Sequence, residues 1–371
     1  MLKKSKIIGA FCTSLLFLGF AHTALAAEYI PFRERHPRLI IPQYEEAKVL
    51  LKEDGPQLIF SDSPEMVQDC GITYRDTIKG KVRLFFHHVN DTKSDKKLAV
   101  VIRNRSIRAA EITLGAFGVS QPRNEEEWLL AGKEAQRDYF HTINRQEKLK
   151  VLKYKELLTG ATGRRFKPNE LITGIIDLET NKPVEIAFLM LPVRTDFALA
   201  LDMYKPLPAD KGNHVLRGTF PSSNVHVTVP EAFNTEGNKI VGITLADNVK
   251  NPYVRGIDAL TGKPVINYGN YGVFYDVHFK TTGKGQALVN FSPEGGTYAG
   301  YGKFGPEGKS KVIPIPAKSV AFGHNGAEDA ITLGKLEGNK QGEVVFSPPG
   351  SSNLPIKIIL IPEKRLEKNN K

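Results

Sequence analysis

An aspartate and a histidine two residues apart, Asp276 and His278, are the residues of this chain whose types and spacing point most directly to chemistry. They lie in a segment of alternating polar and apolar residues that predicts a β-strand, where they share one face with Phe274 and Lys280. A carboxylate and an imidazole on one face can ligate a zinc or copper ion. The sequence shows no third ligand. Two interpretations therefore stay open: a metal-binding module, or a solvated polar face with one carboxylate–imidazole pair.

A second candidate site lies just upstream, where tyrosines are interleaved with glycine and asparagine. Tyr268 and Asn270 fall in the turn before the predicted strand, which makes them the best surface candidates, and Tyr271 begins the face expected to be buried. Tyrosine rings beside small residues can form a flat platform for sugar rings, whereas the same rings beside glycine bends can also pack a core. The candidate ligand-binding residues are therefore Tyr268, Asn270, Tyr271, Asp276 and His278.

Motifs of the common catalytic classes are missing from the sequence. Gly308-Lys309-Ser310 resembles the end of a P-loop, but Lys303 stands where the first glycine is required. There is no G-x-S-x-G elbow, H-E-x-x-H pair or EF-hand loop. Cys70 has no neighbour in sequence that would activate it as a nucleophile. We therefore predict no catalytic residues, no cofactor, and a binding or structural protein rather than an enzyme.

The N-terminus has the three parts of a secretory leader. Three lysines precede the apolar run Ile7–Phe20, and Ala24–Ala26 supplies a small-x-small cleavage site. We expect residues 1–26 to be removed as a signal peptide, leaving a chain that is secreted or associated with the cell envelope. No later stretch is long and apolar enough to predict a transmembrane anchor.

The chain is basic, with 51 Lys and Arg against 40 Asp and Glu among 371 residues. Removal of the leader lowers the formal charge from +11 to +8, because the leader contributes three lysines and no acid. The remaining charge is diffuse and forms no basic helix, so a nucleic-acid partner is not expected. For an exported protein, the predicted partners are cell-wall polysaccharide, anionic wall polymers or an envelope protein.

Alternating apolar residues predict strands along most of the mature chain. Residues 27–55 are predicted to form an arm with one short helix, because a helix-compatible stretch follows Pro42 and ends at Gly55-Pro56. One long helix is expected after Asn124, which is a plausible N-cap. Its apolar face is predicted to contain Trp128, Ala131, Ala135, Tyr139 and Ile143.

A break in the strand pattern predicts how the chain divides into domains. Residues 202–213 hold prolines and a glycine without periodicity, which is typical of a domain boundary. The predicted fold is mainly β: two β-sandwich-like domains, with the long helix inserted in the first. The domains are expected at 56–205 and 206–362, followed by a charged tail at 363–371.

Part of the chain resembles a known group of proteins. The stretch Gly71–Leu114, with RLFFHHVN at 83–90 and VVIRNRS at 100–106, resembles uncharacterised secreted bacterial proteins. In these proteins, β-sandwich segments accompany a small copper amine oxidase-like stalk domain of the cell envelope. NYGV at 270–273 and PEGG at 293–296 are similar in the same way. The resemblance covers roughly a third of the chain and implies an extracellular, envelope-associated protein.

Oxidase activity is not carried over from this resemblance. Copper amine oxidases have an Asn-Tyr-Asp/Glu motif, whose tyrosine becomes the quinone cofactor, and a His-x-His copper pair. Here Asn267 and Tyr268 are followed by Gly269, the upstream threonine position is Pro264, and the sequence contains no His-x-His.

Two functional hypotheses follow from the sequence. The first is an exported, non-catalytic binding or structural module at the bacterial cell envelope. The alternative is an extracellular carbohydrate-active enzyme, whose two carboxylates would come from distant positions and would not form a local motif.

Overall fold

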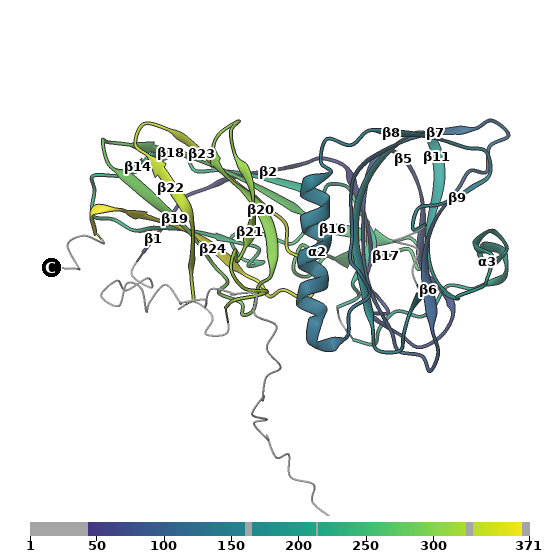
Figure 1. The fold of residues 1–371 in the computed structure, drawn as a ribbon. Helices are drawn as coiled ribbons and strands as arrows, with labels where there is room; N and C mark the ends of the chain where they lie inside the picture. Colours follow the sequence, from purple (N-terminus) through teal and green to yellow (C-terminus); the bar gives the residue numbers. More distant parts are fainter. Residues whose placement is uncertain (1–43, 160–164, 213, 324–328, 366–371) are drawn as a thin grey trace, which may run out of the picture.

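The computed structural model describes residues 44–159, 165–212, 214–323 and 329–365 (Figure 1). It is mainly β, with two sandwich-like bodies side by side and helix α2 (Trp128–His141) between them. The predicted fold class is therefore confirmed. The predicted leader, residues 1–26, lies outside the described residues. Within the described ranges, no helix is long and apolar enough to span a membrane.

A 12-stranded sheet forms the first sandwich around its longest strands, β5 (Gly71–Asn90) and β11 (Leu171–Pro192). The remaining strands of this sheet are β3 (Gln57–Ser61), β4 (Met66–Val67), β6 (Lys96–Arg103), β7 (Ala110–Val119), β8 (Glu147–Val151), β9 (Tyr154–Glu156), β10 (Arg165–Phe166), β12 (Arg217–Phe220), β16 (Arg255–Asp258) and β17 (Lys263–Ile266). The first half of β11 pairs with β7 and the second half pairs with β6. Between the halves, from Thr180 to Val184, the register of β11 against β5 shifts. The sheet thereby encloses a core to which both halves of β11 contribute.

The second sandwich consists of a five-stranded and a seven-stranded sheet. The first contains β1 (Glu45–Glu46), β15 (Val241–Leu245), β19 (Gln286–Ser292), β22 (Ile331–Glu337) and β24 (Ile356–Pro362). The second contains β2 (Leu50–Asp54), β13 (Asn224–Thr228), β14 (Phe233–Asn234), β18 (Phe274–Thr282), β20 (Gly300–Pro306), β21 (Lys311–Ile315) and β23 (Gln341–Phe346). Alternate residues of the two sheets, such as Val277 and Val289, are fully buried in a shared core.

Residues 45–46 and 50–54 form strands, so the short helix predicted for residues 27–55 is wrong in the described part of that arm. β1 pairs with β15, and β2 pairs antiparallel with β13 along all five of its residues. A short isolated helix is marginal in water, because few hydrogen bonds offset the cost of its nucleation. Pairing with the edges of two existing sheets satisfies the same backbone groups without that cost.

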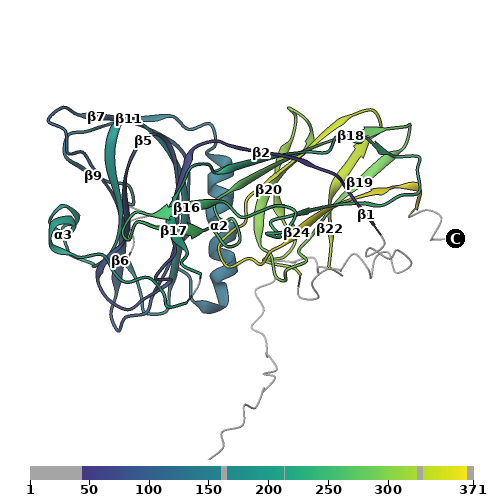
Figure 2. The same cartoon turned by 180° about the vertical axis from the view of Figure 1, so that it is seen from behind.

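The predicted domain boundary at 205/206 does not separate the two sandwiches. Strands β12, β16 and β17 come after the boundary but extend the sheet of the first sandwich. Figure 2 shows β16 and β17 there from behind. Conversely, β1 and β2 come before it but belong to the second sandwich. The chain therefore crosses between the bodies several times.

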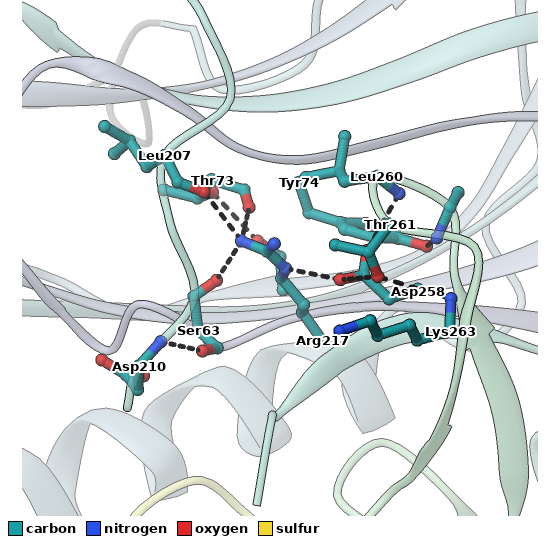
Figure 3. Close-up of polar contacts among 12 residues, drawn as sticks. Ser63, Thr73, Tyr74, Leu207, Asp210, Arg217, Asp258, Leu260, Thr261 and Lys263 are labelled. Carbon is teal, nitrogen blue, oxygen red and sulfur yellow. Dashed lines mark hydrogen bonds and ion pairs between the residues drawn. The ribbon is translucent and has the colours of Figure 1, made fainter. Parts of the chain in front are cut away.

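A buried ion pair holds the late strands against the first sandwich (Figure 3). Arg217 on β12 lies 3.2 Å from the Asp258 carboxylate on β16, and both side chains are at most 4% exposed. The guanidinium also donates to the Leu207 carbonyl at 2.9 Å and the Ser63 carbonyl at 3.3 Å. Asp258 accepts from the backbone N–H of Leu260. These bonds tie the predicted boundary segment into the first sandwich, so it is not a free linker.

Helix α2 packs against both sandwiches. It follows a 3₁₀ turn (Glu125–Glu127), and Asn124 makes no side-chain capping bond to the described residues. Three of the predicted apolar positions, Ala131, Ala135 and Tyr139, are buried, whereas Ile143 lies beyond the helix and is exposed. A second short helix, α3 (Phe197–Met203), was not predicted.

Polar side chains of α2 fasten the second sandwich. Lys133 donates to the carbonyls of Pro316, Ser319 and Val320 at 2.7–3.0 Å. Gln136 donates to the Ser347 carbonyl and accepts from the Tyr301 N–H. The helix therefore bridges the two sandwiches.

Arg83 on β5 is the most highly connected side chain of this junction. Its guanidinium, 5% exposed, binds both oxygens of Asp177 at 2.8 and 3.1 Å. It donates at 2.9 Å to the Ser223 carbonyl and at 3.0 Å to the Asn224 side chain, in the second sandwich. It also lies 4.3 Å from the centre of the Phe274 ring. One side chain of the first sandwich thus holds the starts of β13 and β18.

We expect Arg83→Met to lower the free energy of unfolding by about 3–5 kcal/mol, because it leaves buried acceptors without a donor. The control Arg137→Met removes a surface cation on α2 and should change it by less than about 1 kcal/mol. Urea denaturation followed by the fluorescence of the single tryptophan measures both values. Equal stabilities of the two variants would contradict the role assigned to Arg83.

Candidate metal centre

Parallel pairing of β13 and β18 brings two histidines and an aspartate together on the outer face of the seven-stranded sheet. The register places His226 beside Asp276, and Thr228 beside His278. Residues on either side of these positions, such as Val227 and Val277, are fully buried. Because side chains alternate along a strand, His226, Asp276 and His278 must all point away from the core.

The three side chains are close enough to share one ion. His278 Nε2 lies 3.0 Å from Asp276 Oδ1, and His226 Nδ1 lies 3.3 Å from Asp276 Oδ2. One ligand atom from each residue lies within 4.8 Å of the other two. A tetrahedral zinc ion with bonds of about 2.0–2.1 Å needs its ligands about 3.3 Å apart. The observed spacing therefore suits a zinc-sized ion with little movement of the side chains.

Two buried polar atoms of this cluster lack a hydrogen-bond partner among the described residues: Asp276 Oδ1 and His278 Nδ1. Asp276 Oδ1 lies 3.0 Å from His278 Nε2 and His278 Nδ1 lies 3.3 Å from Glu307 Oε1, but neither contact has the alignment of a hydrogen bond. Buried polar atoms are nearly always satisfied in folded proteins. A bound cation would satisfy Asp276 Oδ1 directly.

Each histidine also faces an outer carboxylate. His226 Nε2 lies 2.8 Å from Asp54 Oδ1 on β2, and His278 Nδ1 lies 3.3 Å from Glu307 Oε1. In both rings, the nitrogen that faces the outer carboxylate is the one turned away from Asp276. The hydrogen bond to His226 lowers the pKa of Asp54, which favours its ionised form. Metal-binding histidines commonly donate their second N–H to a carboxylate, which fixes the ring orientation; His226 has such a bond to Asp54, whereas Glu307 lies beside His278 without one.

The structure supplies a third candidate ligand that the sequence did not show. Asp276 and His278 share a face, as predicted, and His226 joins them from the neighbouring strand. His226 meets Asp276, fifty positions later, only because β13 pairs with β18. No local sequence pattern indicates that pairing. The one available signal was the alternation of His226 with buried Val225 and Val227, which marks it as an outward residue of a strand.

The candidate residues Tyr268, Asn270 and Tyr271 do not form an exposed platform. Asn270 is fully buried, contrary to the surface position expected for it: it donates to the Tyr275 hydroxyl and accepts from the Val254 N–H. Its φ of 48° lies in the left-handed region, which asparagine tolerates in turns. Its amide is therefore occupied by holding the turn.

The two tyrosines of that candidate site face different surroundings. Tyr271 is partly buried, packs 6.3 Å from the Phe85 ring and donates to the Ser352 carbonyl, and burial raises its pKa. Tyr268 is partly exposed, with its ring centre 3.9 Å from that of His214. Tyr271 thus packs against the junction core, whereas Tyr268 packs against His214.

A second titratable cluster lies in the first sandwich, and sequence reasoning missed its acids. Asp62 is 6% exposed and its Oδ1 has no hydrogen-bond partner in the described ranges. Burial raises the pKa of Asp62 well above its ordinary value, and the charges of Glu65 and Asp210 add to this. Burial also raises the pKa of Glu65, whose Oε1 lies 3.8 Å from His87 Nε2.

His87 and His88 are both buried in this region. Burial lowers the pKa of His87 to about 3 and that of His88 to about 4. His88 Nε2 lies 2.9 Å from the Ser61 hydroxyl, and Nδ1 lies 2.9 Å from the Pro64 carbonyl. Both rings therefore belong to the folded structure in their neutral form.

The free energy of unfolding should fall as the pH is lowered from about 6.5 towards 4, because the unfolded chain takes up protons that folded His88 rejects. We expect His88→Gln to reduce this slope by up to about 1.4 kcal/mol per pH unit. Urea denaturation at a series of pH values measures the slope. The control is His141→Gln, at an exposed position of α2. A slope of stability against pH in His88→Gln equal to that of the parent would contradict the assignment.

Comparisons with known proteins do not place the chain in a family. No family model matches it. No curated protein matches it either. Among solved structures it is similar to a cupin 2 conserved barrel domain protein from Leptotrichia buccalis, with 12% identity over 85% of this chain and 90% of that chain and a TM-score of 0.12. It is also similar to vicilin from Capsicum annuum, with 10% identity over 72% of this chain and 73% of that chain and a TM-score of 0.10. Scores this low carry no argument about function.

Proposed function

We propose that this chain is an exported, non-catalytic binding module of the bacterial cell envelope, and that it holds a divalent transition-metal ion on its second sandwich. The observation that carries the proposal is the convergence of His226, Asp276 and His278, with one ligand atom of each within 4.8 Å of the others. The site lies on two central strands of a sheet, so its geometry is set by backbone pairing rather than by a loop.

The ligand set favours zinc or copper. Two imidazoles and one carboxylate suit Zn²⁺ and Cu²⁺, whereas Ca²⁺ and Mg²⁺ prefer oxygen ligands. The three side chains are between 25% and 34% exposed, so a bound ion would keep a position open to water or to a partner group. A fourth ligand supplied from outside would make the ion a point of attachment.

The export and envelope parts of the proposal are supported by the sequence. The leader-like segment at residues 1–26, the positive charge of the remaining chain and the resemblance of Gly71–Leu114 to secreted envelope proteins all favour this location. No reaction step is part of the proposal.

The metal site is tested by calorimetric titration of residues 27–371 with ZnCl₂. We expect one site per chain in the parent. Loss of an outer carboxylate typically lowers metal affinity by roughly 10- to 100-fold, and Asp54→Asn should lower the zinc affinity within that range. His226→Ala and His278→Ala each remove a ligand and should lower the zinc affinity by more. Lys280→Ala, on the same strand and face, is the control and should bind as the parent does. Equal affinity of His226→Ala and the parent would contradict the site.

The carbohydrate-active enzyme remains the second candidate, and the Asp62 cluster is the observation that favours it. A glycosidase needs a carboxylic acid of raised pKa near a second carboxylate. Asp62 has such a pKa, and the charge of Glu65 contributes to it.

If this second candidate is right, the chain releases reducing ends from cell-wall polysaccharide, and Asp62→Asn lowers the rate by about 100-fold or more, because it removes the general acid. Asp69→Asn, at an exposed position nearby in sequence, is the control. A parent protein that releases no reducing ends would reject the enzyme and leave the binding module.

A further inference from the structure

Two large apolar side chains project from neighbouring loops at one end of the first sandwich. Ile107, in the loop between β6 and β7, is 100% exposed, and Leu152, in the turn between β8 and β9, is 76% exposed. We call the loop 104–109 together with residues 151–153 the apolar tip. Single exposed apolar residues are ordinary, but two on adjoining loops form a protrusion that burial would stabilise.

Asn104 joins the two loops of the apolar tip. Its amide nitrogen donates to the carbonyl of Arg108 at 2.9 Å in its own loop and to that of Leu152 at 3.1 Å in the other. Its backbone N–H donates to the Lys153 carbonyl at 2.8 Å, and its side-chain oxygen accepts from the Ser106 N–H. The tip is therefore held in shape before any partner binds, which reduces the ordering cost of binding.

Cations surround the two apolar side chains. Arg105, Arg108 and Lys153 are exposed on the tip itself. Lys182, from the bend in β11, donates to the Arg108 carbonyl at 3.3 Å. The apolar residues thus lie at the centre of a basic surface.

The acids near the apolar tip are faced by cations of their own. Glu185 binds Arg103 at 2.7 Å and Arg105 at 2.8 Å. Glu111 lies directly opposite Lys150 in the β7–β8 pair. Because these two acids face other cations, Arg108 and Lys153 can attract an external anion.

We propose that the apolar tip docks the protein on an anionic phospholipid surface, with Ile107 and Leu152 entering the boundary between headgroups and acyl chains. A basic surface alone would fit any polyanion, including a wall polymer. A wall polymer, however, offers no apolar phase for exposed isoleucine and leucine, whereas a bilayer offers both an apolar phase and anionic headgroups. The metal site is on the other sandwich, so this inference does not depend on the proposed metal.

Sedimentation of residues 27–371 with vesicles tests the proposal. The protein should bind vesicles of equimolar phosphatidylglycerol and phosphatidylcholine. Its binding to vesicles of phosphatidylcholine alone should be weaker by about tenfold or more. The double variant I107S/L152S should lose about tenfold or more of the binding to anionic vesicles. The matched control is Val249→Ser, which removes a side chain that is 81% exposed on a loop of the second sandwich.

Tryptophan fluorescence provides the second measurement, and it reports insertion rather than attraction. Leu152→Trp should shift its emission to shorter wavelength on anionic vesicles, whereas Val249→Trp should not. Binding by I107S/L152S as strong as that of the parent would overturn the proposal, since charge alone would then account for it. Retention on peptidoglycan carrying its anionic polymers, with no binding to vesicles, would overturn it in favour of a wall ligand.

Discussion

The burial of one guanidinium at the junction of the two sandwiches is the constraint on which the rest of the structure depends. Arg83 can be buried only if all its donors are satisfied, and Asp177, Ser223, Asn224 and the Tyr139 hydroxyl together do this. Asn224 is the first residue of β13, and the ring beneath the guanidinium belongs to Phe274, the first residue of β18. The same contact that joins the sandwiches therefore fixes where these two strands start.

That starting point determines the candidate metal centre. Asn224 pairs with Phe274, and two residues further along each strand the same register pairs His226 with Asp276. A slip of one residue in either strand would turn its polar side chains into the core, where Val225, Val227 and Val277 are buried. The ligand cluster is thus a consequence of strand register, and the outer carboxylate of Asp54 joins it because β2 pairs with β13.

Local patterns in the sequence predicted what depends on local structure. Alternation was sufficient for the β class and for the shared face of Asp276 and His278, and helical spacing was sufficient for α2. Long-range pairing was not predictable: His226 reaches the site through a parallel strand, and residues 45–46 and 50–54 become strands because two sheet edges are available. The boundary near residue 206 failed because Arg217 and Asp258 anchor later strands to the first sandwich. Asn270 looked like a surface turn residue, but its amide holds that turn from inside.

The most direct test of the metal centre is diffraction from crystals of residues 27–371 grown with ZnCl₂, measured on both sides of the zinc absorption edge. Zinc held by this site should give an anomalous peak about 2.0–2.2 Å from a nitrogen of His226, a nitrogen of His278 and an oxygen of Asp276. Asp54 should keep its hydrogen bond to the other nitrogen of His226. Zinc bound only at other side chains, with these three residues unchanged, would contradict the metal centre.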